Sequence, residues 1–270
     1  MRTYSHRVRG QAGLDFETQF VTALNGKKYE DLKSPLSDLL KRIFPGIQKD
    51  ELILAQKADP RGKSDVSIFT GEGRAEISLK STSGDLIHSS PNDKFIRYLY
   101  EQGVSEFSLK TLLYFLYRDG TADGSGDRKW TYEETMFRLS PRIADFNEEV
   151  NGNRVLLQDC LDLALFRGNH PEIPPANWLY HGTLNGGIVV SRYQIAIWAK
   201  RILKMDFIRN PHIGPLHIRP YVQSVSEGTK SKDKLDWLRL KWVGMDSNLA
   251  FICKKLPAHR KMAVFEQGKE

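Results

Sequence analysis

The fold is decided by one stretch of the sequence, residues 62–80, which reads GKSDVSIFTGEGRAEISLK. Residues 64–70 alternate and are rich in β-branched side chains, and residues 74–81 form a second run that is typical of a strand. The tetrapeptide Thr70-Gly71-Glu72-Gly73 between them predicts a tight turn. The sequence therefore predicts an antiparallel hairpin, which starts a meander.

The second strand of this hairpin separates polar from apolar side chains. Glu76, Ser78 and Lys80 share one face because side chains alternate along a strand, and the apolar residues between them form the core face. The tight turn makes the two strands neighbours, so Asp65 of the first strand can lie close to Lys80. The alternative interpretation is an ordinary solvated sheet face on which Lys80 extends toward water.

The segments around the hairpin follow helical or strand periodicity. Before it, apolar spacing predicts helices over residues 14–25 and 35–43 and a strand over residues 51–56. After it, we expect a polar loop over 81–93, helices over 94–102, 108–117, 132–151 and 154–166, a flexible excursion over 119–127, a proline-rich crossover loop over 169–176, either a strand passing into a helix or one long amphipathic element over 188–204, and paired strands over 216–224 and 235–243. This order predicts an α/β (α+β) fold with a mixed central sheet flanked by helices and a β-rich C-terminal part.

One carboxylate lies in the apolar stripe of the first predicted helix. At about 100° per residue, Glu17 falls in the middle of the stripe formed by Leu14, Phe20, Val21 and Leu24. A carboxylate that points into a core is costly unless a cation or a metal ion meets it. Glu17 is therefore either a metal ligand or one partner of a buried salt bridge with Lys80 or an arginine.

The positive charge of the chain is concentrated near its C-terminus. The 270 residues carry a formal net charge of +7, and a composition that is 40% hydrophobic and 27% charged excludes a disordered or fibrous chain. Residues 199–261 contain 14 Lys or Arg residues and 5 Asp or Glu residues, a net of +9, so the remainder carries −2. The sequence therefore predicts a basic lobe and an anionic partner.

The cysteines and the apolar runs indicate the compartment. Cys160 and Cys253 are too few for a disulfide framework and are expected to be reduced thiols. Residues 1–16 lack the apolar core of a signal peptide, and no apolar run approaches the roughly 20 residues that span a bilayer. We therefore expect a soluble, cytoplasmic protein that has no membrane partner.

The set Glu17, Asp65, Ser78 and Lys80 resembles the active-site signature of the PD-(D/E)XK nuclease superfamily. In that signature a helix carboxylate precedes a strand Asp, a hairpin follows, and the next strand carries an acidic residue, a spacer and a Lys. The resemblance covers roughly residues 13–117. It implies a restriction-endonuclease-like core and Mg²⁺-dependent hydrolysis of DNA phosphodiesters.

The sequence departs from this signature at two positions. Ser64 stands where the superfamily has Pro, and Ser78 stands at the acidic position. Some restriction enzymes of the superfamily have Ser or Gln at the acidic position and recruit a carboxylate from elsewhere. The candidates for that carboxylate are Glu76, Glu17, Asp85 and Asp93.

The resemblance implies a role for each residue. Asp65 would hold Mg²⁺, and Glu17 or Glu76 would complete the metal site. Ser78 could offer its backbone carbonyl or its hydroxyl. Lys80 would orient the attacking water, help to deprotonate it and neutralise charge on the phosphate. The implied catalytic residues are thus Asp65, Ser78, Lys80 and Glu17, and the implied metal ligands are Asp65, Glu17 and Glu76.

Basic residues follow the predicted C-terminal strands. A two-stranded ribbon can enter a major groove. Lysines at its tip suit phosphates, whereas Arg219 and Arg239 are better suited to bidentate contact with guanine. A solvated hairpin with a lysine-rich tip is the alternative. The candidate DNA-binding residues are Arg219, Lys230, Lys232, Lys234, Arg239 and Lys241.

These observations predict a type II restriction endonuclease that cuts double-stranded DNA with Mg²⁺. We expect one nuclease domain over residues 1–270, with a catalytic core (13–117), a helical part (118–180) and a basic DNA-binding part (181–270). It would act as a monomer or homodimer, with a cognate DNA methyltransferase as genetic partner. The alternatives are a structure-specific repair or junction-resolving nuclease, and a catalytically inactive DNA-binding protein.

Overall fold

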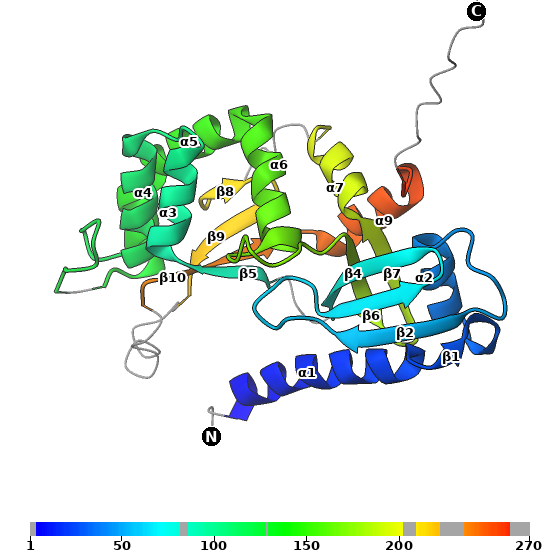
Figure 1. The fold of residues 1–270 in the computed structure, drawn as a ribbon. Coiled ribbons are helices and arrows are strands. Elements are labelled where there is room, and N and C mark those ends of the chain that lie inside the picture. Colours follow the sequence, from blue (N-terminus) through cyan, green and yellow to red (C-terminus); the bar gives the residue numbers. More distant parts are fainter. Residues whose placement is uncertain (1–3, 82–85, 128, 202–208, 222–234, 260–270) are drawn as a thin grey trace, which may run out of the picture.

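Two β-sheets with helices packed around them make up the fold (Figure 1). The computed structural model describes residues 4–81, 86–127, 129–201, 209–221 and 235–259, and for residues 4–13 it gives the backbone alone. The first sheet has six strands in the order β1-β2-β3-β4-β6-β7, and the second has four in the order β5-β10-β9-β8. Among the strands of the described residues, only β4 and β6 pair in parallel. The expected mixed α/β fold with a mixed sheet flanked by helices is thereby confirmed.

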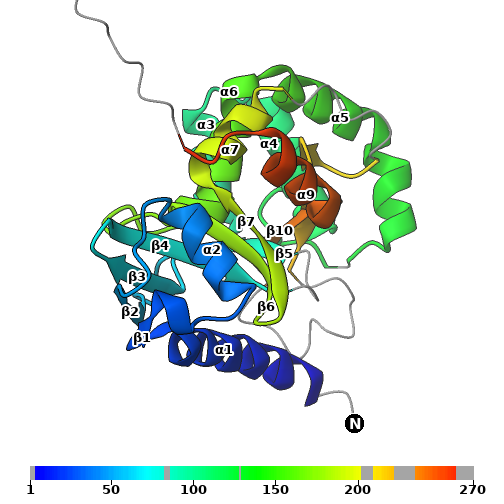
Figure 2. The ribbon, with the colours of Figure 1, turned by 90° about the vertical axis from the view of Figure 1, so that its right-hand side faces the viewer.

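The first sheet is curled, and two helices cover one of its faces (Figure 2). Its apolar face includes Ile68, Ile77 and Trp178, which pack with Phe20 of the first helix and Leu40 of the second. Burial of these large side chains is what fixes the helices on the sheet. The elements are α1 (Tyr4–Leu24), β1 (Lys27–Lys28), the 3₁₀ turn Tyr29–Asp31, α2 (Leu36–Ile43), β2 (Leu52–Lys57), β3 (Val66–Thr70), β4 (Gly73–Lys80), β6 (Trp178–Thr183) and β7 (Gly186–Ser191).

The second sheet packs against the remaining helices and forms the larger core. Trp242, Leu240 and Ile218 lie in this core together with Phe146 and Leu112 from the helices. The elements are β5 (Leu86–Pro91), α3 (Asn92–Glu101), α4 (Glu106–Tyr117), α5 (Tyr132–Gly152), α6 (Arg154–Asp162), the π-helical turn Leu163–Arg167, α7 (Arg192–Ala199), β8 (His212–Ile213), β9 (Leu216–Pro220), β10 (Trp237–Trp242) and α9 (Met245–Lys255).

The strand pair β6–β7 joins the two cores. Trp178 and Tyr180 of β6 pack in the core under α1 and α2. Leu179, which lies between them and points the opposite way, and Val190 of β7 pack in the larger core. The same two strands are therefore covered on both faces. As a separate observation, none of the described helices is long and apolar enough to span a bilayer.

Several sequence predictions are confirmed and one is wrong. The hairpin over residues 64–81 forms as β3 and β4, and residues 188–204 contain a strand that passes into a helix, with Ser191 capping α7. The two predicted C-terminal strands pair as β9 and β10. The polar loop expected over 81–93 is wrong, because residues 86–91 form β5 and pair with β10. The predicted ribbon is thus part of a four-stranded sheet.

The two cysteines are both free thiols. Cys160 is buried in the larger core, where burial raises the pKa of its thiol to about 12. A thiol with so high a pKa is inert, because only the thiolate is a nucleophile or a metal ligand.

Candidate active site

Asp65 and Lys80 meet at one end of the first sheet. Asp65 directly precedes β3, and Lys80 is the last residue of β4. The Lys80 Nζ atom lies 3.8 Å from Asp65 Oδ2, and both side chains are largely buried. The backbone N–H of Leu79 also donates to Asp65 Oδ2 over 2.5 Å. The hairpin register therefore brings together the two residues that the sequence predicts to be neighbours.

Ser78 lies between these two charges and is fully buried. Its hydroxyl accepts a hydrogen bond from Lys80 Nζ over 3.0 Å and donates one to Asp65 Oδ2 over 3.4 Å. Lys80 Nζ also donates to the backbone carbonyl of Leu79 over 3.1 Å. Ser78 thus positions an ammonium and a carboxylate toward each other. A carboxylate in place of Ser78 would add a like charge beside Asp65.

Glu17 approaches the same end of the sheet from α1. Its carboxylate lies 3.7 Å from Lys57 Nζ at the end of β2, which makes Lys57 its partner rather than Lys80 or an arginine. Burial raises the pKa of Glu17, and the charge of Asp65 raises it further. The negative charge of Asp65 therefore disfavours the ionised form of Glu17, and a nearby cation would favour it.

Glu76 is held by other side chains on the same face of β4. Its carboxylate accepts hydrogen bonds from Ser64 Oγ over 2.7 Å and from Ser67 Oγ over 2.8 and 2.9 Å. It also forms an ion pair with Arg74. These contacts occupy the carboxylate, so we leave Glu76 out of the metal site that we propose below.

The donor set fits a weakly held hard cation. Among the described residues, no group of three or more His, Cys, Asp and Glu side chains could hold a metal ion. Mg²⁺ is usually bound by one or two carboxylates and keeps several waters, so it needs no such group. Asp65 and Glu17 supply two carboxylates. The residues present therefore fit Mg²⁺ better than a transition metal.

Sequence reasoning missed Lys63, which lies close to the site. Its ammonium donates to the backbone carbonyl of Ile87 in β5 over 2.9 Å. Burial and the charge of Lys80 lower the pKa of Lys63 to about 7. Gly168 (φ +70°) packs against the Lys63 stem, and a Cβ there would lie 3.1 Å from Lys63 Cγ. The contact with β5 could not be foreseen, because this strand was not predicted.

Two histidines also lie around the site and were not assigned from the sequence. His181 of β6 is the register partner of Lys80, and its Nε2 lies 2.5 Å from Asp246 Oδ1. His88 of β5 is buried against Asn169, 3.2 Å from its side-chain oxygen. Burial and the charge of Lys63 lower the pKa of His88 to about 3, so this side chain is neutral at pH 7.

The predicted DNA-binding residues fall into two groups. Arg219 lies on β9, and Arg239 and Lys241 lie on β10. The lysines predicted for the tip of the ribbon, and one candidate carboxylate, lie outside the described residues: Lys230, Lys232, Lys234 and Asp85. The last candidate carboxylate, Asp93, belongs to α3 and lines a groove with Tyr100 and Tyr117.

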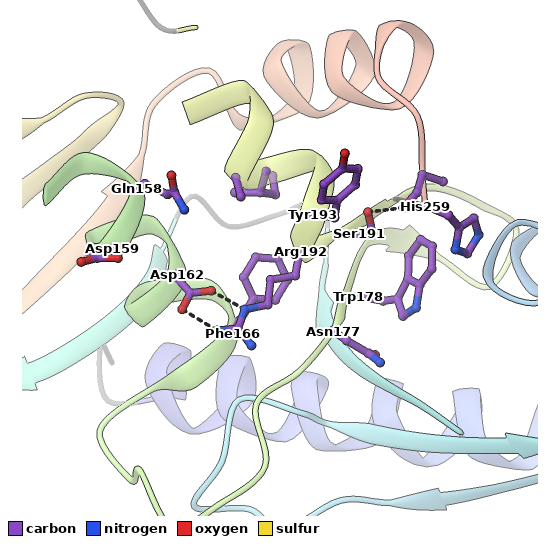
Figure 3. A pocket seen from close by; sticks show the side chains of 13 residues that line it. Gln158, Asp159, Asp162, Phe166, Asn177, Trp178, Ser191, Arg192, Tyr193 and His259 are labelled. Atoms are coloured by element: carbon purple, nitrogen blue, oxygen red, sulfur yellow. Dashed lines mark hydrogen bonds and ion pairs between the residues drawn. The ribbon is translucent and has the colours of Figure 1, made fainter. Parts of the chain in front are cut away.

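A separate cavity of about 590 Å³ lies beside the start of β6 (Figure 3). Asp162 accepts hydrogen bonds there from Arg192 over 2.5 and 2.7 Å and pairs with Arg167 over 2.7 Å. The rings of Trp178 and His259 meet edge to face at 5.5 Å. The residues that line this cavity include none of the predicted site residues, and its one arginine is already paired, so it plays no part in the function proposed below.

Neither a scan against protein-family models nor a search of curated proteins found a match to this chain.

Proposed function

We propose that this protein is a Mg²⁺-dependent endonuclease that hydrolyses phosphodiester bonds in double-stranded DNA, in the manner of a type II restriction enzyme of the PD-(D/E)XK superfamily. The observation that carries the proposal is the cluster of Asp65, Ser78 and Lys80 on adjacent strands, with Glu17 approaching from α1. A second observation is the basic second sheet, which supplies the charge needed to hold DNA. The proposed partner in the cell is a DNA methyltransferase that protects the host's own sites.

Each residue of the cluster has one task in this proposal. Asp65 and Glu17 hold Mg²⁺, which when bound supplies Lewis-acid stabilisation of the phosphate. Lys80 donates a hydrogen bond that orients the attacking water and neutralises charge that develops on the phosphoryl oxygens. Ser78 accepts a hydrogen bond from the Lys80 ammonium and so holds it beside Asp65. The partly buried setting strengthens each of these interactions.

The proposal is tested by incubating the protein with plasmid DNA and Mg²⁺. Discrete fragments are expected, whereas cleavage confined to branched DNA would favour a structure-specific nuclease. Binding without cleavage would favour an inactive DNA-binding protein, with Ser78 at the acidic position as the cause.

The matched variants are Lys80→Ala and Lys49→Ala, which remove the same charge at different places. Lys80→Ala should abolish cleavage and leave DNA binding nearly intact, because its ammonium acts at the reacting phosphate. Lys49→Ala should cleave like the unmodified protein. If Lys80→Ala lost binding while each bound complex still cleaved, the role given to Lys80 would be rejected.

A further inference from the structure

The second sheet has an outer face that carries no carboxylate. None of its four strands contains Asp or Glu. Along β10 the side chains alternate, so that Trp237, Arg239 and Lys241 are partly exposed while the residues between them are buried in the larger core. The register adds Ser89 of β5 and Arg219 of β9 to this side. We call these five residues the outer face of the second sheet.

Two arginines stand directly opposite each other on this outer face. Arg239 pairs with Arg219 across β10 and β9, and with Ser89 across β10 and β5, so the three side chains form one row. Like charges directly opposite on neighbouring strands destabilise a sheet. No carboxylate among the described residues forms a salt bridge with either arginine, and both Nε atoms are buried without a hydrogen-bond partner there. An anionic ligand that is rich in hydrogen-bond acceptors would offset both the repulsion between the two arginines and their missing hydrogen bonds.

The geometry of the row favours base edges over phosphates. The Arg239 guanidinium lies over the Tyr221 ring, 3.9 Å from its centroid, and this contact fixes the plane of its donor fork. A planar, oriented fork matches the O6 and N7 acceptors of guanine in the major groove. Neighbouring strands lie about 4.8 Å apart, so side chains on β9 and β10 can reach neighbouring base pairs.

We propose that Arg219 and Arg239 read guanines in the major groove of the duplex that the nuclease cuts. This inference rests on the proposed function and deepens it, because it names the bases that direct cleavage. The sequence alone suggested each arginine separately. The structure adds that they form a pair, that the pair is continuous with β5, and that Tyr221 orients one of them.

The connection through β5 also limits where the DNA is cut. Ser89 lies nine positions after Lys80, and nine extended steps of the chain span at most about 30 Å. In addition, Lys63 beside the cluster contacts Ile87, two residues before Ser89. Base pairs rise about 3.4 Å along the duplex, so the scissile bond should lie within about nine base pairs of the guanines that are read.

The experiment uses the full chain with Lys80→Ala, which should bind DNA without cutting it, to select duplexes from a randomised pool. The selected duplexes should share guanines at fixed positions. Adding Arg219→Lys or Arg239→Lys should lower the preference for those duplexes over unselected DNA by about 10- to 100-fold, because lysine keeps the charge and loses the fork. The control is Arg138→Lys, since Arg138 also lies over an aromatic ring, Trp130, but on α5.

The outcomes separate this inference from the proposed function. If the unmodified protein cuts plasmid DNA but the selection enriches no shared guanine, the reading role fails and the nuclease stands. If the selection succeeds but the unmodified protein cuts nothing, the nuclease fails and the reading role stands. If both Arg→Lys variants keep the preference for the selected duplexes and melt at temperatures like that of the control, Arg219 and Arg239 do not read the guanines. If the cuts map far more than nine base pairs from the selected guanines, the limit set by the connection through β5 is wrong.

Discussion

The two sheets of this protein handle charge in opposite ways. At one end of the first sheet, acidic groups pair with basic groups, as Asp65 does with Lys80 and Glu17 does with Lys57. On the second sheet, Arg219 and Arg239 face each other with no carboxylate in any of the four strands. Carboxylates beside an ammonium can hold a metal ion and polarise a water, whereas a positively charged surface attracts a polyanion. In the proposed nuclease, the first sheet would therefore cut the DNA and the second sheet would hold it.

The largest expected effect tests whether the two sheets fold as one unit. Trp242→Ala in the larger core and Phe20→Ala under the first sheet should each cost about 3–5 kcal/mol of unfolding free energy, because both rings are fully buried. Both variants should shift one common transition, since β6–β7 belongs to both cores. Urea unfolding followed by circular dichroism measures this, and Phe137→Ala, an exposed ring, is the control. Two separate transitions would show that the sheets unfold independently.

The next effect tests the cluster of Asp65, Ser78 and Lys80 on the first sheet. Asp65→Asn keeps the shape of the side chain and removes its charge, so cleavage should fall about 10³-fold, the scale expected when one electrostatic group is lost from an active site. DNA binding should change little, because the second sheet is untouched. Asp145→Asn, at an exposed position on α5, is the matched control, and single-turnover cleavage is the measurement. Equal losses in the two variants would argue against a special role for Asp65.

A smaller effect tests the boundary between the two sheets through His88. Burial holds its pKa near 3, below the ordinary value of 6.5, so the native state binds fewer protons than the unfolded state. The contribution of His88 to the free energy of unfolding is therefore fully present above pH 6.5 and declines as the pH falls toward 3. Lys63 and Lys80 are the charged groups that act on it. From pH 7 to pH 5 the loss should be on the order of 2 kcal/mol.

The pH dependence has a matched control. His88→Gln should remove this part of the loss, whereas His170→Gln, at an exposed histidine, should keep it. Denaturant unfolding at pH 5, 6 and 7 measures both variants. Identical pH profiles for the unmodified protein and His88→Gln would show that His88 is not buried in its neutral form.

The smallest effect tests the binding of DNA by the second sheet. Lys241→Ala on β10 should weaken binding to all DNA sequences alike and reduce the slope of log K against log salt by about 1, which is the contribution of one phosphate contact. Lys28→Ala makes the same charge change on β1, at the edge of the first sheet, and should leave the slope unchanged. Fluorescence anisotropy of a labelled duplex at several salt concentrations measures both. Equal slopes for the two variants would contradict a role for the second sheet, rather than the first, in contacting phosphates.

The sequence could predict what depends on neighbouring residues. Alternation and turn residues predict the β3–β4 hairpin, and from it follows the approach of Asp65 to Lys80, 3.8 Å apart in the structure. The helical angle of Glu17 also predicts that its carboxylate needs a partner. The identity of that partner, Lys57, was beyond reach because an angle gives a direction and no neighbour.

The sequence could not predict what depends on distant strands. β5 contains only two large apolar residues, Leu86 and Ile87, and becomes a strand by pairing with β10, about 150 residues later. The same long-range pairing places Ser89 beside Arg239. The parallel pairing of β4 with β6, which brings His181 next to Lys80, likewise leaves no local signal. The residues around the cluster were therefore missed, while its centre was found.

The path of β5 has a consequence for how such a protein can change. The chain leaves β4 at Lys80 and enters the second sheet at Leu86, so exchanging either sheet as a separate unit would break this connection. A modular protein acquires a new target by swapping a part. In the proposed nuclease, a new target would therefore arise by single substitutions on a surface that stays attached to the strand carrying Lys80, with the fold and the activity retained at each step. Directed evolution of this chain should therefore proceed by point mutation and should fail by recombination of halves.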